Sequence, residues 1–222
     1  MRHLLVAHGS PDPRHAAFVR SLAAGVSRLG VPTEAAFLEH DLPDVRSWLS
    51  RVREPVTTLG LLLAPGYHAQ VDVPRLIRTA PAGVPVTDLG VLGSGPWLFG
   101  VVDELVSSVG GDPTTPVALV SAGSSRAEAA THLRAFADGW AATRPGPVRL
   151  TAPDGLAGVA GTWADPVVLP FLVAPGVIGD RIVGAADRLG LRATPVLGVA
   201  DRFPEVLASR LTGGLVGRAL AG

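Results

Sequence analysis

Runs of apolar residues alternate with longer amphipathic segments along the whole chain. Short apolar runs bounded by Gly or Pro are typical of buried parallel strands, and apolar residues repeated every three or four positions are typical of helices. The pattern predicts strands at residues 3–7, 34–38, 57–63, 84–89, 117–121, 148–151, 167–173 and 194–199. It predicts helices at residues 13–29, 43–53, 72–79, 97–109, 126–143, 179–189 and 204–212. This alternating order indicates an α/β fold in which helices flank parallel sheets.

The pattern of the first half of the chain returns in the second half. Three pairs of segments match in the same order, namely residues 5–10 with 119–124, 62–66 with 172–176, and 89–90 with 197–198. A repeat of this length exceeds the periods of solenoid proteins and indicates a duplicated domain. We therefore expect two tandem domains, residues 1–111 and 112–222, joined by the Gly- and Pro-rich segment 110–116.

Two histidines occupy the same kind of position in the first half. His8 and His68 each stand at or just past the end of an apolar run that breaks at Gly or Pro. In open α/β sheets ligands bind at the carboxyl edge of the strands, so two imidazoles there indicate metal handling or proton transfer. The matching positions of the second half are Ala122 and Ile178. We therefore expect the chemistry in the first half, with the second half forming a wall of the site.

Composition narrows the classes of function. The formal net charge is zero and is balanced between the halves, which argues against a nucleic-acid partner. Because the chain has no cysteine, metal ligands must be imidazole, carboxylate or water, which suit ions such as Co²⁺, Ni²⁺ or Fe²⁺. No signal peptide and no apolar stretch of membrane-spanning length is visible, so we expect a cytoplasmic protein without a membrane partner.

The motifs around the two histidines resemble those of the sirohydrochlorin chelatase family, the CbiX- and SirB-like class II tetrapyrrole chelatases. The first motif is a strand followed by His8-Gly9-Ser10 and an acidic-Pro-Arg turn at residues 12–14. The second is an apolar strand followed by Pro-Gly-x-His at residues 65–68, with an acid and Pro at residues 72–74. The resemblance extends over nearly the whole chain, in the two-domain form of the family.

This resemblance implies a lyase that inserts a divalent metal into sirohydrochlorin during cobalamin or sirohaem biosynthesis. The ion would be Co²⁺ or Fe²⁺, with Ni²⁺ as a further option, and no other cofactor is implied. The implied fold has two chelatase-like domains facing each other across the active-site cleft, and His8 and His68 are the implied catalytic and metal-binding pair. Two imidazoles suit this chemistry, because neutral His binds such cations and accepts protons near neutral pH.

Other residues near these motifs are candidates for binding the substrate. Backbone N–H groups at helix N-termini bind anions, and Arg binds carboxylates, of which sirohydrochlorin carries eight. The candidate substrate-binding residues are Gly9, Ser10, Arg14, Tyr67, Ser124, Arg126 and Arg181. For the serines ordinary helix capping remains an alternative, and for the arginines a solvated surface position does. Asp72 either orients His68 or caps the helix that follows.

The positions of the remaining histidines give less reason to assign them to the functional site. His3 opens a strand at the opposite end from His8, and His132 lies in the middle of a helix, so both are interpreted as structural. His40 stands in an acidic turn and is interpreted as solvated. His15 lies in the first turn of the helix after His8, where it can face a substrate.

Two other functions remain open at this stage. A protein of the same fold could bind a tetrapyrrole or a metal as a carrier without turnover. Phosphoryl transfer through the His-Gly-Ser loop is disfavoured, because it calls for an Arg before the histidine and Ala7 stands there. Since duplication already supplies two domains, a monomer suffices, and a homodimer is also compatible with the sequence.

Overall fold

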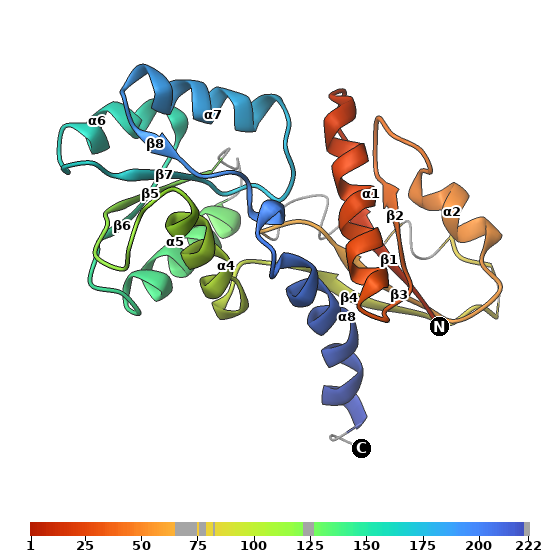
Figure 1. The fold of residues 1–222 in the computed structure, drawn as a ribbon. Helices are drawn as coiled ribbons and strands as arrows, with labels where there is room; N and C mark the ends of the chain where they lie inside the picture. The colour runs from red at the N-terminus through yellow and green to blue at the C-terminus, as the bar shows by residue number, and fades with distance from the viewer. Residues whose placement is uncertain (65–74, 76–78, 82, 122–126, 220–222) are drawn as a thin grey trace. The chain divides into compact units, whose positions relative to one another are not determined.

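The computed structural model describes residues 1–64, 75, 79–81, 83–121 and 127–219, with only the backbone of residues 214–219. It contains two four-stranded sheets in tandem, each entirely parallel and each accompanied by helices (Figure 1). The α/β class predicted from the sequence is therefore confirmed. Among the described residues no helix is both long and apolar enough to cross a membrane.

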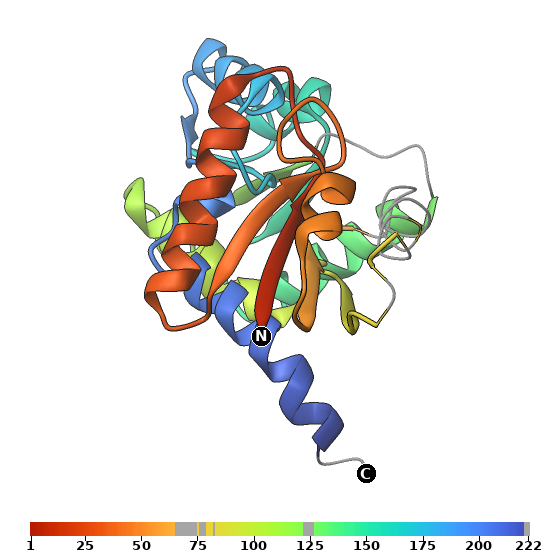
Figure 2. The same cartoon turned by 90° about the vertical axis from the view of Figure 1, so that its right-hand side faces the viewer.

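The first sheet has the strand order β2-β1-β3-β4. Its elements are β1 (Arg2–Ala7), α1 (Pro13–Arg28), β2 (Thr33–Phe37), α2 (Val45–Arg51), β3 (Val56–Gly60) and β4 (Val86–Val91). Figure 2 shows α1 and α2 on the two sides of this sheet. Leu4 and Val6 of β1 belong to the core cluster that contains Trp48 and Leu49 of α2. Because β1 lies between two strands and is buried from His3 onward, residues 4–7 form a continuous apolar run.

The second sheet repeats this order as β6-β5-β7-β8. Its elements are β5 (Val117–Val120), α5 (Ala127–Ala141), β6 (Val148–Thr151), α6 (Leu156–Ala160), β7 (Val167–Pro170), α7 (Val177–Arg188) and β8 (Arg192–Ala193). The described residues also include the short 3-10 helices η2 (Pro96–Leu98), η3 (Pro153–Gly155) and η4 (Leu197–Val199). The helices that close the two halves are α4 (Phe99–Ser108) and α8 (Phe203–Ala219).

Two segments differ from the sequence-based prediction. Residues 194–199 do not form the expected strand: the two-residue β8 lies just before them, Pro195 has no N–H to donate to a ladder, and η4 occupies residues 197–199. The five-residue helix α6 was not predicted, since it is too short to show a helical period. The expected helix at residues 72–79 falls largely outside the described residues.

The structure divides into two compact units, and the two closing helices, α4 and α8, decide where the boundaries fall. One unit comprises residues 1–93 with 204–222, and the other comprises residues 94–203. In the first unit, Gly25 of α1 lies against Pro204 at the start of α8, so a β-carbon on residue 25 would be 3.4 Å from the proline ring. In the second, Trp140 of α5 donates a hydrogen bond of 3.0 Å to Asp103 of α4. The sequence repeat divides the chain at 111/112, whereas each closing helix packs with the other sheet.

Candidate functional site

His8 lies directly after β1, at the carboxyl edge of the first sheet. The backbone N–H of Glu39 donates to the carbonyl of His8 at 2.9 Å, and that of Ser10 donates to the carboxylate of Asp41 at 3.1 Å. The loop after β1 is therefore joined to the loop after β2. Because β1 and β2 are parallel neighbours, their carboxyl ends meet at one edge, where ligands of such sheets bind.

The ring of His8 makes a hydrogen bond within this loop. Its Nδ1 lies 3.2 Å from the carbonyl oxygen of Gly9. A carbonyl can only accept, so Nδ1 is the donor in this contact, and in the neutral ring Nε2 then carries the lone pair. This is the arrangement of many metal-ligating histidines, in which a backbone carbonyl fixes one ring nitrogen and the other binds the ion.

Gly9 is required by the backbone of this loop. Its φ of +93° lies in the region that L side chains rarely adopt. A β-carbon on residue 9 would overlap the carbonyl oxygen of Glu39 and lie 2.9 Å from its carbonyl carbon. The glycine of the His-Gly-Ser motif thus lets the two loops approach each other, a role distinct from the substrate contact predicted for it.

Ser10 and Arg14 both have partners within the protein. The hydroxyl of Ser10 accepts a hydrogen bond from the N–H of Asp12 at 3.1 Å. Asp12, not Ser10, is the N-cap of α1, and its carboxylate accepts from both the backbone N–H and the guanidinium of Arg14. These hydrogen bonds from Arg14 lower the pKa of Asp12. The substrate contacts expected of Ser10 and Arg14 remain predictions.

His15 lies close to His8 and is partly buried. Burial lowers the pKa of His15; the charge of Asp41 opposes this shift, and that of His8 adds to it. Its Nδ1 is buried and has no hydrogen-bond partner among the described residues. The ring meets Phe37 edge-on, with centroids 6.5 Å apart. The structure therefore places a partly buried imidazole with a lowered pKa at the edge where His8 lies.

The acidic turn after β2 belongs to the same edge. Glu39 and Asp41 are tied to His8 and Ser10, and His40 between them is exposed, with a φ of 66° and its Nε2 3.7 Å from the Glu39 carboxylate. From the sequence alone this turn is interpreted as solvated, with no part in the site. The sequence does not show that β2 is the neighbour of β1, and therefore that this turn lies beside His8. The sheet order shows it.

Several predicted site residues lie outside the described residues, namely His68, Tyr67, Asp72, Ser124 and Arg126. Arg181 is exposed and lies in α7, in the second unit. Among the residues that the structure describes, no three His, Asp or Glu side chains are arranged to hold a metal ion. The part of the site that can be described is therefore His8 with Glu39, Asp41 and His15.

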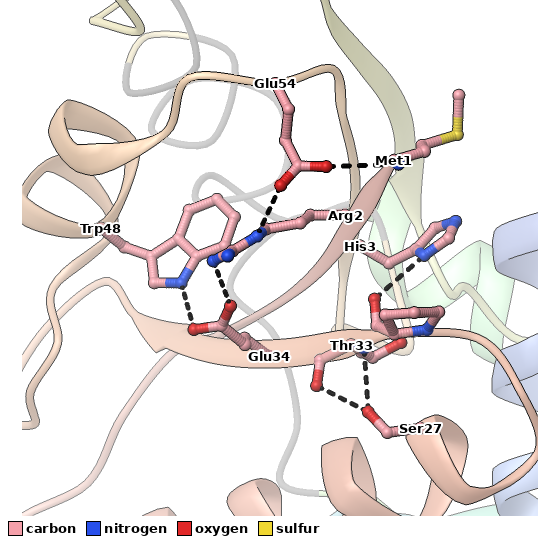
Figure 3. A network of polar contacts seen from close by, with 9 residues as sticks. Met1, Arg2, His3, Ser27, Thr33, Glu34, Trp48 and Glu54 are labelled. Atoms are coloured by element: carbon pink, nitrogen blue, oxygen red, sulfur yellow. Dashed lines mark hydrogen bonds and ion pairs between the residues drawn. The ribbon is translucent and has the colours of Figure 1, made fainter.

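Two other histidines occupy the positions expected of them. His3 is buried at the opposite edge of the first sheet, where its Nδ1 lies 3.1 Å from the carbonyl of Pro32. Figure 3 shows it near a polar network in which Glu34 accepts from Arg2 and from the indole of Trp48. His132 in α5 accepts a 3.2 Å hydrogen bond from the backbone N–H of Ser94 through Nε2. Both contacts are structural.

The fold of the whole chain is that of the two-domain chelatases. It is similar to the structure of SirB from Bacillus subtilis with Fe³⁺, with 17% identity, a TM-score of 0.79 and 97% of each chain covered. It is also similar to CbiX described as the terminal enzyme of sirohaem biosynthesis in denitrifying bacteria, with 22% identity, a TM-score of 0.72, and 96% of this chain and 99% of that chain covered. At these identities the likeness concerns the fold.

The sequence of the first half also matches a known protein family. Residues 2–109 match the sequence model of the CbiX family, so the first half of the chain resembles that family. The matched range contains His8, the acidic turn after β2 and the Pro-Gly-x-His motif. A search of curated proteins found no match.

Proposed function

We propose that this protein is a chelatase that inserts a divalent metal ion into sirohydrochlorin. The observation that carries the proposal is the position of His8 at the carboxyl edge of a CbiX-family sheet, with its Nδ1 held by a backbone carbonyl. In this tautomer Nε2 carries the lone pair with which an imidazole binds a cation. The macrocycle exchanges two pyrrole N–H protons for one M²⁺, so the site must deliver the ion and accept protons.

His8 and His68 together perform both tasks in this proposal. Two imidazoles with water in the remaining positions hold an ion loosely enough to release it, whereas four protein ligands would retain it. Neutral imidazole also accepts a proton near pH 7. The carboxylates of Glu39 and Asp41 at the same edge attract a divalent cation.

The ion in this proposal is Co²⁺ or Fe²⁺, with Ni²⁺ as a further candidate. Support comes from the fold relatives, since SirB of Bacillus subtilis was solved with Fe³⁺ and that of subspecies spizizenii with cobalt. The second structure has 17% identity, a TM-score of 0.79, and covers 95% of this chain and 93% of that chain. The product would serve cobalamin or sirohaem formation.

The second half contributes binding and not metal chemistry in this proposal. Ala122 and Ile178 stand where the first half has His8 and His68. In the sequence, Ser124 and Arg126 stand between β5 and α5, and Tyr67 precedes His68, whereas Arg181 lies near the start of α7. We assign these polar groups to the carboxylates at the periphery of the macrocycle.

A multiple-turnover assay tests the function. Purified protein is mixed at catalytic concentration with sirohydrochlorin and Co²⁺, Fe²⁺ or Ni²⁺ in turn, and the absorbance of the metallated product is followed. His8→Ala and His68→Ala should fold normally and lose most turnover, and the double variant should be little worse than either. As a control, His132→Gln keeps an acceptor for the Ser94 N–H and should retain activity.

A tetrapyrrole or metal carrier is the competing function. It is favoured by the absence of imidazoles at the matching positions of the second half. A carrier would give one stoichiometric absorbance change and no further product, whereas a chelatase forms many equivalents. Wild-type rates in the His8→Ala and His68→Ala proteins would refute the assignment of the pair.

A further inference from the structure

The carboxyl edge of the second sheet presents a group of apolar side chains to solvent. Val177 and Ile178 in the first turn of α7 are 50% and 45% exposed, and Val199 in η4 is 48% exposed. Among the described residues of this unit the other large apolar side chains with comparable exposure are Trp97 and Leu189. Three of five therefore gather at the edge where a parallel sheet binds ligands. We call these three residues the apolar edge.

The backbone holds the segments of the apolar edge side by side. The N–H of Leu197 donates to the carbonyl of Leu172 at 2.8 Å, and that of Gly198 donates to Val173 at 3.0 Å. This pairing continues past β7 and β8 and places η4 beside the segment that leads into α7. The start of α7 packs on the same segments, since a β-carbon on Gly179 would lie 3.7 Å from both Leu172 and Val196. The first turn of α7 and η4 therefore share one edge.

Positive charge borders the apolar edge. Arg181, one turn into α7, is exposed and makes no ion pair with any residue in the described part of the chain. The N-cap of α7 is Gly176, which offers no side-chain cap, and no atom lies within 4 Å of the place of its β-carbon. Asp180 contributes one negative charge and has a partner of its own. The surface thus combines apolar contact with a cation that can meet a carboxylate.

The size of the apolar edge distinguishes between possible occupants. A stable protein interface buries about 1,200–2,000 Å² and involves roughly 20–30 residues on each side. Three half-exposed side chains are far fewer, but they suit one face of a planar ring system. A flat, carboxylate-bearing macrocycle fits both the apolar residues and the guanidinium next to them.

We propose that Val177, Ile178 and Val199 form a hydrophobic platform for one face of the tetrapyrrole, with Arg181 contacting a peripheral carboxylate. The inference rests on the proposed function and extends it from the periphery of the substrate to the ring itself. It also gives a physical reason for Ile178, the residue aligned with His68. In the second half this position contributes apolar contact with the ring, so an imidazole is not needed there.

The test measures binding of metal-free sirohydrochlorin separately from turnover. Ile178→Ser and Val199→Ser each remove apolar contact and should raise both Kd and KM about fivefold to tenfold, with kcat unchanged. The weakening should persist in high salt, because it is not electrostatic. Leu189→Ser is the matched control, since Leu189 is 39% exposed at the far end of the same helix, and its Kd should equal that of the wild type.

Three results would overturn the platform. If the wild-type protein turns over and both Ile178→Ser and Val199→Ser bind sirohydrochlorin with the wild-type Kd, the platform is refuted. The chelatase proposal is then unaffected. A change of oligomeric state in these variants by sedimentation, at constant Kd, identifies a protein interface instead. A wild-type protein that neither binds nor metallates sirohydrochlorin refutes the chelatase proposal itself. Unfolding curves of the serine variants confirm that a raised Kd is not a loss of fold.

Discussion

Gly9 and Glu39 approach so closely that no side chain fits between them. The N–H of Glu39 donates to the carbonyl of His8 at 2.9 Å, and a β-carbon on Gly9 would overlap the carbonyl oxygen of Glu39. This contact places the acidic turn after β2 beside the proposed metal ligand. The glycine of the His-Gly-Ser motif is therefore explained by packing between two loops.

Gly9→Ala should be more damaging than the same change at another positive-φ glycine. Gly30 has a φ of +85° and no atom within 4 Å of its β-carbon position, so Gly30→Ala should cost only the backbone strain, about 1 kcal/mol. Gly9→Ala adds a backbone clash and should cost clearly more, with loss of turnover as the loop moves. Urea unfolding of both variants measures this difference. Equal destabilisation would mean that the contact with Glu39 does not constrain the loop.

His15 should make stability depend on pH. Its pKa is about 6.5 in the unfolded chain and lower in the folded protein, chiefly because the ring is buried. Between these two values the unfolded state binds more protons, so the free energy of unfolding falls as the pH drops below about 6.5. His15→Gln removes this dependence, and its urea midpoint should change less than that of the wild type between neutral and mildly acidic buffer. Parallel pH curves for the two proteins would contradict the prediction.

Arg126 and Arg181 should contribute affinity for the substrate. Arg126→Ala or Arg181→Ala should raise KM with little change in kcat. The binding free energy lost should be about 1–3 kcal/mol, as expected for the removal of one charge-assisted hydrogen bond to a carboxylate. Arg188→Ala, in the last turn of α7, is the control and should leave KM unchanged. Steady-state kinetics with varied sirohydrochlorin measure both constants. A collapse of kcat at constant KM would assign chemistry to the second half.

The last helix should be essential to the first unit. Leu207 of α8 is fully buried, and the chain from Pro204 onward belongs to the unit of residues 1–93. Leu207→Ala should therefore cost about 2–5 kcal/mol of unfolding free energy. Leu29→Ala, at a side chain that is 49% exposed, should stay within about 0.5 kcal/mol of the wild type in the same unfolding experiment.

The sequence by itself determined the class of fold and one member of the site. Buried parallel strands are read from continuous apolar runs, so β1, β5 and β7 were visible, and His8 followed from the end of β1. Pro13 likewise marked the start of α1, whereas the capping residue, Asp12, was shown only by the structure. These signals are local, because burial on both faces and helix capping impose a pattern on neighbouring residues.

Only the tertiary structure decided which segments meet. Strand order brings Glu39 and Asp41 to His8, although about thirty residues separate them in the chain. Neighbouring strands are chosen by packing over the whole sheet, which no local pattern encodes. The same holds for α4 and α8, since α4 belongs to the unit of residues 94–203 and α8 to the unit that contains residues 1–93. Local propensity determines whether a segment becomes a helix or a strand. The burial of its apolar face against a particular partner determines where that element lies in the fold.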